Sequence, residues 1–330
     1  METVIIKIGK GRGKKGLVAA ARALKEGALV AFPTETVYGL GTNAFNAEAV
    51  RKIFKAKGRP ADNPLIVHIW SKRQVPLVAC GITPAAKALI RKFFPGPLSI
   101  VLKKSKRIPL EVTGGLDTVC VRMPSMKLAR CFLSMCDVPV AAPSANISGK
   151  PSPTSWKHVM RDLGGKIPYL LAGPDSSFGL ESTVVDCSGK GPRLLRAGSL
   201  GLERIEGAVG KVAVPRKLRK ALCPGMRYRH YAPKARVIVV GGARDAPAKK
   251  RGWAYIGMGV APRNSSFCFL AKGKTEYARR LFSFLRECDD RGIGAVYAQK
   301  TDCKGIGRAI NDRLERASFA RRNSQPAREA

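Results

Sequence analysis

Four short segments of this 330-residue chain combine glycine, proline and polar side chains with the residue types that bind anions. They are residues 33–41, 55–68, 142–152 and 179–183, the last followed by Arg196 and Gly198. Small hydroxyl and amide groups that follow a strand suit contacts to phosphate, ribose or carboxylate, and lysines and arginines add positive charge. Each segment alone is equally compatible with an ordinary turn or a helix end, so its function depends on the fold around it.

The elements around these segments are predicted by the spacing of apolar residues. Leu17, Ala21 and Leu24 recur at the spacing of one helical face within 14–26, and Asn46 is a suitable N-cap for the next helix. Because several strands are joined by loops alone, the pattern indicates a mixed α/β sheet with helices packed around it. The expected strands are 28–32, 65–69, 99–103, 118–122, 140–142 and 183–187, and the further helices are 83–93 and 127–136.

The chain is long enough for two domains, and its pattern changes twice. We expect a first domain over 1–207, a linker over 208–235 and a second domain over 236–330. The linker is basic, contains several prolines and is long for a simple tether, which is typical of a functional loop. The last part alternates strands and helices like a small Rossmann-like sheet, but its Gly241-Gly242 pair does not complete a dinucleotide-binding fingerprint.

The composition restricts the partners and the compartment. The chain has 60 Lys and Arg against 23 Asp and Glu, a net charge of +37 that no single basic arm carries. This excess favours phosphorylated small molecules or nucleic acid as partners, and is equally compatible with a generally basic surface. The nine cysteines include no CxxC, and with three histidines they form no zinc pattern, which favours reduced thiols. Since no apolar run could cross a bilayer and no signal peptide is visible, we expect a cytoplasmic protein without a membrane partner.

Taken together, the four segments resemble the threonylcarbamoyl-AMP synthase family, whose catalytic domain is called YrdC-like. The family's Lys-x-Arg and Ser-x-Asn pairs match Lys57-Gly58-Arg59 and Ser144-Ala145-Asn146. The stretches FPTETVYGLG, NPLIVHI, PGPLSIVLK, GLDTVCVRMP and ESTVVD also match, and PGMRYRHYAP at 224–233 resembles the linker of the family's long, two-domain form. The resemblance implies an α/β fold: a YrdC-like mixed twisted sheet with surrounding helices, plus a smaller Rossmann-like C-terminal domain.

The same resemblance implies an L-threonylcarbamoyladenylate synthase, which is a nucleotidyltransferase. Such an enzyme condenses L-threonine, bicarbonate or CO₂ and ATP into threonylcarbamoyl-AMP and releases pyrophosphate. Mg²⁺ is expected to enter with ATP, without direct ligation by the protein. The product is expected to pass to a tRNA threonylcarbamoyl transferase, which forms threonylcarbamoyladenosine in tRNA.

The family's site residues carry over to matching positions of this chain. Because Tyr231 lies in the linker, we hypothesise that the linker orders around ATP as a lid over the active site. The resemblance implies catalytic roles for Lys57, Arg59, Ser144 and Asn146, and threonine binding by Thr36, His68, Arg122, Ser182 and the backbone of Ala142. It implies ATP binding by Arg59, Asn63, Thr118, Ser144, Ser152, Arg196 and Tyr231.

Two positions depart from the family's pattern. Ser125-Met126-Lys127 stands where an acidic or small residue and then His-Pro are usual, which affects the expected loop geometry beside Arg122. Arg196-Ala197-Gly198 replaces Arg-Pro-Gly. Because the arginine is kept and only the rigidity of proline is lost, we expect a small effect.

Two other functions fit parts of the sequence. A YrdC-like domain also occurs in larger carbamoyltransferases of hydrogenase maturation, whose zinc-binding and acylphosphatase segments are not visible here. A double-stranded RNA or tRNA-binding module with a vestigial nucleotide pocket is the other alternative, which the +37 charge supports. A vestigial pocket is expected to lose polar motif residues, whereas all of those assigned are present. Weak RNA binding by a basic surface is compatible with the enzyme.

Overall fold

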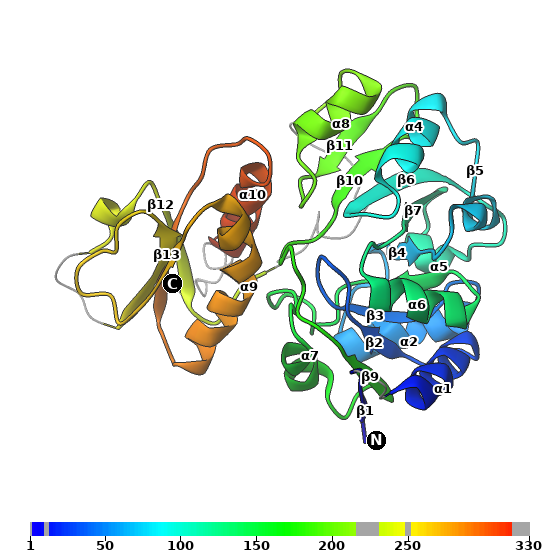
Figure 1. Ribbon diagram of the computed structural model, residues 1–330, viewed down its shortest axis with the longest axis horizontal. Helices are drawn as coiled ribbons and strands as arrows, with labels where there is room; N and C mark the ends of the chain where they lie inside the picture. Colours follow the sequence, from blue (N-terminus) through cyan, green and yellow to red (C-terminus); the bar gives the residue numbers. More distant parts are fainter. Residues whose placement is uncertain (1, 10–12, 216–230, 248–251, 319–330) are drawn as a thin grey trace, which may run out of the picture. The chain divides into compact units, whose positions relative to one another are not determined.

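The computed structural model describes residues 2–9, 13–215, 231–247 and 252–318 (Figure 1). The chain divides into two compact units, one made of Met1–Ser148 with Ser152–Arg227 and the other of Gly149–Pro151 with Tyr228–Ala330. Most of the linker signature at 224–233 lies outside the described residues, as does the tail beyond 318.

The first unit is built on a mixed sheet of 11 strands within the described residues. Parallel and antiparallel pairs alternate irregularly, as expected where several strands are joined by loops alone. The strands lie in the order β1 (Val4–Lys7), β9 (Tyr169–Ala172), β2 (Val30–Phe32), β3 (Gly39–Asn43), β8 (Val140–Ala142), β4 (Ile66–His68), β7 (Thr118–Arg122), β6 (Leu98–Lys104), β10 (Thr183–Asp186) and β11 (Arg193–Arg196), and β5 (Ala79–Cys80) pairs with β6.

Helices cover both faces of this sheet, so its central strands are buried on both sides. In β2, Val30 and Phe32 belong to one apolar cluster and Ala31 to the other, since successive residues of a strand face opposite sides. The cluster around Phe32 lies under α1 (Lys14–Lys25) and α6 (Lys127–Cys136), which pack against each other (Figure 1). Residues of α2 (Ala47–Lys57), α3 (Val75–Val78, after the 3₁₀ turn Lys72–Gln74), α4 (Pro84–Phe93), α5 (Leu110–Thr113), α7 (Trp156–Leu163) and α8 (Leu202–Val209) join the other cluster.

Helix α2 brings the Lys-x-Arg pair to the sheet, and its sequence fixes both of its ends. The Asn46 side chain accepts a hydrogen bond from the Ala49 amide at 3.0 Å, which confirms the predicted N-cap. At the other end Gly58 adopts a left-handed conformation, with φ of 59°, that ends the helix after Lys57. Arg59 therefore lies just beyond the end of the helix.

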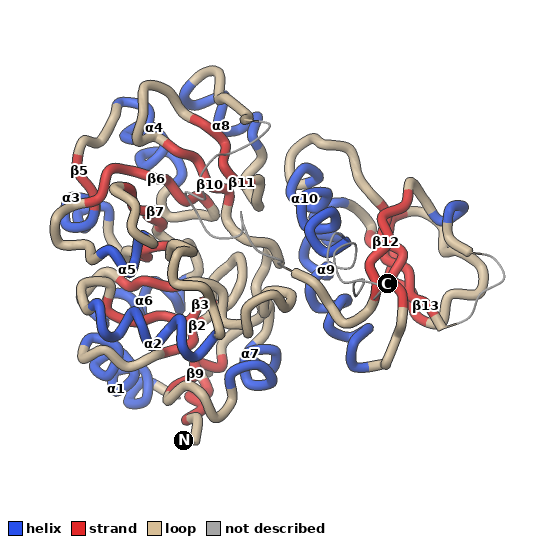
Figure 2. Tube along the Cα trace, turned by 180° about the vertical axis from the view of Figure 1, so that it is seen from behind, coloured by secondary structure: helices blue, strands red, loops and turns tan. Residues whose placement is uncertain are grey.

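The second unit contains a four-stranded parallel sheet in the order β12 (Arg236–Val240), β15 (Ala295–Gln299), β13 (Trp253–Met258) and β14 (Phe267–Ala271). Its described residues form the helices α9 (Lys274–Asp290) and α10 (Gly307–Ser318) (Figure 2) and the 3₁₀ turn η2 (Ala243–Asp245). The amides of Gly241 and Gly242 donate to one Asp245 carboxylate oxygen at 2.8 and 3.2 Å. The chain's own carboxylate thus binds amides that could otherwise face a phosphate.

The fold class expected from the sequence is confirmed, with a mixed α/β sheet in the first unit and a small parallel sheet in the second. Within the described ranges, no helix combines the length and apolar character needed to cross a membrane. The same ranges hold no group of three His, Cys, Asp or Glu side chains placed to bind a metal ion.

Candidate functional site

Arg122, at the carboxyl end of β7, is the centre of the expected threonine site, and its side chain is buried. Its Nη1 donates to the Thr36 hydroxyl at 2.7 Å, and its Nη2 donates to Glu35 Oε1 at 2.7 Å. The Nε faces the Gly96 carbonyl at 3.4 Å. Because each terminal nitrogen carries a second N–H, the held guanidinium has the donors for a substrate carboxylate as well.

Glu35 is the buried partner of Arg122 that sequence reasoning missed. Burial raises the pKa of Glu35, but the Arg122 charge and hydrogen bonds from the Ser125 backbone and Arg122 together hold that pKa below its usual value. The Met126 amide also faces Glu35 Oε2 at 3.4 Å. Because this contact comes from the backbone, the departure at Ser125-Met126-Lys127 leaves the Glu35–Arg122 pair in place.

A tight turn after β2 places the Thr36 side chain in contact with Arg122. The Thr34 hydroxyl accepts from the amides of Thr36 and Val37, at 3.2 and 3.3 Å, and lies 2.6 Å from the Val37 carbonyl. This side-chain turn reverses the chain, so that β3 runs back antiparallel to β2. The polar residues of 33–41 are therefore fixed at the carboxyl end of β2.

His68, the last residue of β4, lies beside Arg122. In the parallel pairing of β4 with β7, His68 lies opposite Arg122, and its ring packs edge-on against Phe32 with centroids 6.0 Å apart. Burial and the nearby Arg122 charge lower the pKa of His68 to about 3. The imidazole is therefore neutral at pH 7, and suits a hydrogen bond to a substrate better than charge neutralisation.

This buried histidine predicts a dependence of stability on pH. The unfolded chain binds a proton at His68 below about pH 6.5, whereas the folded chain does so only near pH 3. The stabilisation is therefore complete above pH 6.5 and is lost as the pH falls, at up to about 1.4 kcal/mol per pH unit. Urea unfolding at pH 7 and pH 5 is expected to show a larger loss for the native chain than for His68→Asn. Equal losses would contradict this assignment.

Ser182 and Arg196 join the two expected ligand sites. Arg196 Nη2 donates to the Ser182 carbonyl at 2.9 Å and to its hydroxyl at 3.2 Å. The same hydroxyl lies 2.8 Å from that of Ser99. Since Ser182 is expected to bind threonine and Arg196 to bind ATP, the two sets of residues meet at this contact. Ala142, whose backbone is expected to assist, ends β8 beside β4.

Lys57 is almost fully buried, and its ammonium group holds the Ser-x-Asn segment. Its Nζ donates to the Ser144 carbonyl at 2.5 Å and also to the Asn146 carbonyl. The Ser148 amide in turn donates to the Lys57 carbonyl at 2.9 Å. The expected catalytic residues Lys57, Ser144 and Asn146 are thus brought together, with a cation beside the serine.

Arg59 contacts the backbone around Asn63, and two buried polar groups of the expected ATP set have no partner in the described part of the chain. Its Nε and Nη2 donate to the carbonyls of Asn63 and Pro64, at 3.2 and 3.0 Å. The Asn63 Nδ2 and the Thr118 Oγ1 are buried without a hydrogen bond to any described residue. Because such groups are uncommon and costly in proteins, both are well suited to a ligand. All three residues belong to the expected ATP set.

Further contacts bind the four segments to one another. The Leu40 amide donates to the Pro143 carbonyl at 2.9 Å, and the Ala145 amide donates to the Tyr38 carbonyl at 2.8 Å. The Ser152 hydroxyl donates to Glu181 Oε1 at 2.6 Å. With the contacts of Lys57, these hydrogen bonds join all four segments to one another.

Gly198 permits the close approach that places Arg196 on Ser182. A Cβ at position 198 would lie 2.3 Å from both the Ser182 carbonyl carbon and the Thr183 nitrogen, which are backbone atoms. We expect Gly198→Ala to lower the free energy of unfolding in urea by about 1–3 kcal/mol. Gly191→Ala is the control, because no heavy atom lies within 4 Å of its added Cβ. Similar stability of the two variants would contradict the packing argument.

Tyr231 is the expected ATP residue that belongs to the second unit. Its buried ring stacks on Phe282 with centroids 5.3 Å apart, and the Arg313 guanidinium lies 5.0 Å from the ring centre. These contacts fix the ring within that unit. Its contact with ATP and the lid role of the linker stay predictions, since residues 216–230 lie outside the described part of the chain.

Comparisons with known proteins agree over nearly the whole chain. Residues 22–198 match the family model described as "Telomere recombination", and residues 200–318 match that of the threonylcarbamoyl-AMP synthase C-terminal domain. The threonylcarbamoyl-AMP synthase of Pyrococcus abyssi is 45% identical over 96% of this chain and 98% of its own length. That of Bacillus subtilis is 38% identical over 92% and 93%.

A solved structure extends the agreement to the fold. The crystal structure of P. abyssi Sua5 complexed with L-threonine matches with a TM-score of 0.90 at 44% identity, over 96% of this chain and 98% of that one. Both the catalytic and the C-terminal parts are included in this match. The chain therefore belongs to the threonylcarbamoyl-AMP synthase family.

Proposed function

We propose that this protein is an L-threonylcarbamoyladenylate synthase that uses L-threonine, bicarbonate or CO₂ and ATP. The observation that carries the proposal is the direct contact between Ser182 and Arg196. It joins the residues around the buried Arg122, which suit an amino-acid carboxylate, to cations and polar groups that suit a nucleotide. The P. abyssi relative, whose structure is complexed with L-threonine, supports the amino-acid assignment.

The reaction needs two bond-forming steps and no enzyme nucleophile. The amine nitrogen of threonine attacks the carbon of CO₂, which bicarbonate supplies by losing hydroxide, and a proton passes to solvent. One oxygen of the resulting carbamate then attacks the α-phosphorus of ATP. The bond between that phosphorus and the bridging oxygen breaks, and pyrophosphate leaves. The products are threonylcarbamoyl-AMP and pyrophosphate, which makes the enzyme a nucleotidyltransferase.

The protein's main contribution is to hold several anions close together. Arg122 binds the threonine carboxylate, while neutral His68 and the Thr36 and Ser182 hydroxyls orient the substrate without adding charge. Arg59 and Arg196 offset the repulsion between carbamate and phosphates, and Lys57 adds a cation beside Ser144. Asn63, Thr118, Ser144 and Ser152 supply neutral contacts to ATP.

The donor set of the ATP site fits a magnesium ion that arrives with its nucleotide. Mg²⁺ prefers oxygen ligands and commonly binds nucleotide phosphates while keeping several waters. The expected ATP residues are cations, amides and hydroxyls, which suit phosphate oxygens better than they suit a bare dication. When bound, the ion neutralises phosphate charge in the displacement.

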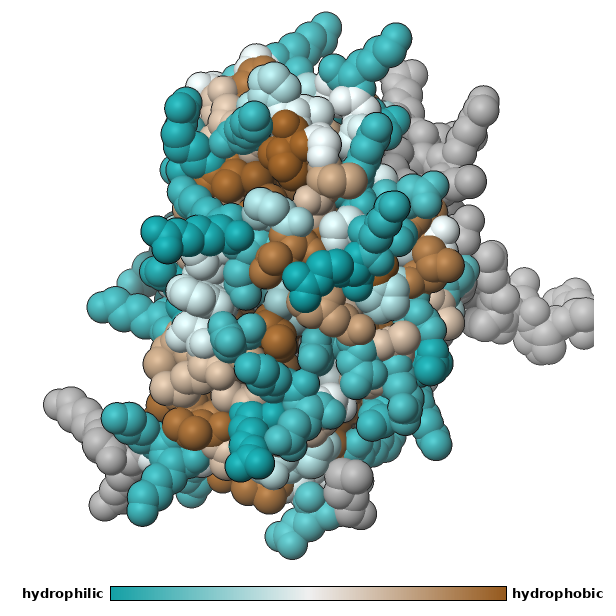
Figure 3. Space-filling model, turned by 90° about the vertical axis from the view of Figure 1, so that its right-hand side faces the viewer, coloured by the Kyte–Doolittle hydropathy of each residue, from teal (hydrophilic) through white to brown (hydrophobic). Residues whose placement is uncertain are grey.

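The chemistry of threonylcarbamoyl-AMP indicates what kind of enzyme must use it next. A carbamic–phosphoric anhydride is an activated acyl donor, so an acceptor enzyme must consume it, and we propose a tRNA threonylcarbamoyl transferase. The +37 charge and a surface rich in hydrophilic side chains (Figure 3) support weak, salt-sensitive attraction for RNA alongside the enzyme activity.

The proposed chemistry is tested by following the carbon of bicarbonate. Purified protein is incubated with Mg²⁺, ATP, threonine and ¹³C-bicarbonate, and the nucleotide products are examined by mass spectrometry. We expect a threonylcarbamoyl-adenylate that carries the heavy carbon. An adenylate of threonine without that carbon would instead indicate an amino-acid-activating enzyme, and would refute the proposal.

A further inference from the structure

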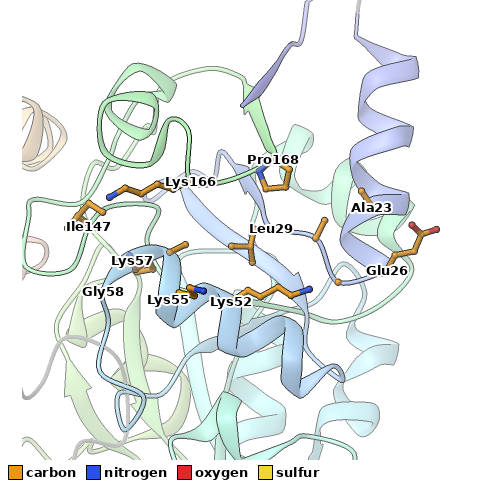
Figure 4. A pocket seen from close by; sticks show the side chains of 13 residues that line it. Ala23, Glu26, Leu29, Lys52, Lys55, Lys57, Gly58, Ile147, Lys166 and Pro168 are labelled. Carbon is orange, nitrogen blue, oxygen red and sulfur yellow. The ribbon is translucent and has the colours of Figure 1, made fainter. Parts of the chain in front are cut away.

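The first unit contains a cavity whose open space is not used by any step of the proposed reaction. Its volume is about 920 Å³, which is in the range of cavities that hold small-molecule ligands. It lies between the end of α1, the residues that lead into β2 and β9, and one side of α2 (Figure 4). Its apolar lining includes Ala23, Ala28, Leu29, Ala56, Ile147 and Pro168.

The position of this cavity separates it from the threonine residues. Ala28 and Leu29 precede β2, and Pro168 precedes β9, which runs parallel to β2. The cavity therefore opens at the amino ends of these strands. Thr36 follows the carboxyl end of β2, so the two sites lie at opposite ends of that strand.

Three lysines give the cavity its charge. Lys52 and Lys55 lie almost one turn apart on α2, and Lys166 lies before β9 (Figure 4). Within the described residues, none of the three makes a hydrogen bond or an ion pair through its ammonium group. The acidic group of the lining, Glu26, is already paired with Arg22 at 3.0 Å. The lining thus combines three positively charged lysines with an apolar floor made of the side chains named above.

We propose that this cavity binds an organic phosphate whose apolar or aromatic body contacts the floor and whose phosphate contacts the lysines. A phosphate monoester carries nearly two negative charges at pH 7 and has three acceptor oxygens, which suits cations that approach from two elements. Burial of an apolar body against Leu29 and Ile147 adds affinity that inorganic phosphate cannot gain. The site therefore selects amphipathic anions over either part alone.

A ligand in this cavity would also contact residues next to those expected to take part in catalysis. Lys57, Gly58 and Ile147 also line the cavity, while the Lys57 ammonium group holds the carbonyls of Ser144 and Asn146. A ligand here would thus contact the end of α2 and the segment that the Lys57 side chain fixes. The binding proposal itself does not depend on the proposed synthase activity, and its test measures binding alone.

Isothermal titration calorimetry with the full chain tests the proposal, with naphthyl phosphate, inorganic phosphate and naphthol as separate probes. We expect naphthyl phosphate to bind about tenfold or more tightly than either other probe. The double variant Lys52→Glu/Lys166→Glu is expected to weaken its binding about tenfold or more. All of these lysines are exposed, so the fold is expected to tolerate the changes.

A matched control separates the cavity from the general charge of the chain. Lys14→Glu/Lys87→Glu makes the same change in net charge at exposed lysines that do not line the cavity. We expect this control to bind naphthyl phosphate as the native chain does. An equal loss in both double variants, an affinity that neither variant changes, or equal binding of inorganic phosphate would overturn the proposal.

Discussion

Replacement of Arg59 by alanine is expected to reduce threonine-dependent pyrophosphate release strongly, with a loss of about 100- to 1000-fold in kcat/KM for ATP. The guanidinium holds the Asn63 carbonyl, and the buried Nδ2 of Asn63 has no partner among the described residues. Removal of this cation is expected to take away charge stabilisation at the α-phosphate of ATP. Initial rates at varied ATP measure the effect, and saturating ATP is expected to restore little of it.

The control for this experiment lies on α2, the helix that precedes Arg59. Arg51 is exposed on α2 and pairs with Glu111, so Arg51→Ala removes an equal charge from the surface. We expect it to keep nearly full activity. Because Arg59 also holds the carbonyls of Asn63 and Pro64, unfolding in urea must be compared for both variants. Equal losses of activity in the two variants would contradict a direct role for Arg59.

Replacement of Arg122 by glutamine is expected to have two separable effects. The KM for threonine is expected to rise about 100-fold or more, since a bidentate carboxylate contact is lost. The free energy of unfolding is expected to fall by about 3–5 kcal/mol, because Glu35 is left as a buried, uncompensated charge. Threonine-dependent rates and urea unfolding measure the two effects.

The double variant Arg122→Gln/Glu35→Gln separates stability from substrate binding. Removal of both charges eliminates the unpaired carboxylate, so stability is expected to return most of the way to that of the native chain. The KM for threonine is expected to stay as high as in the single variant. Recovery of threonine binding in the double variant would show that Arg122 acts through the fold and not on the substrate.

The regular elements were largely predictable from local patterns. The strands at 118–122 and 140–142 and the helix at 127–136 have the expected bounds, because apolar runs there end at clear polar or proline boundaries. Strand β3 was missed, since Gly39 and Gly41 are poor strand formers. A Cβ at Gly41 would lie 2.6 Å from Val140 Cγ1, so glycine is needed there for close packing between strands. Local propensity carries no information about such a contact.

The order of the strands in the first unit's sheet could not be predicted from local sequence patterns, for a similar reason. Strand β1 pairs with β9 in a register that joins Val4 to Tyr169, although the two residues are far apart in the sequence. Such pairing depends on which apolar faces meet in the folded chain. The mixed character of the sheet was predictable, whereas its strand order was not.

The sequence predicted those residues of the candidate site that are themselves expected to contact the substrates. Its supporting contacts were not, as Glu35 illustrates. This residue lies in the motif 33–41, yet its role follows from an arginine 87 positions away in the sequence. The possible signal was an acidic residue between two threonines in an otherwise apolar segment, which requires a buried cation as partner.

The central claim is tested most directly by pyrophosphate release from ATP with Mg²⁺, with threonine and bicarbonate each present or absent. We predict release that requires both, together with a threonylcarbamoyl-adenylate product. Release that is independent of threonine, or none at all from folded protein, would contradict the assignment of a synthase.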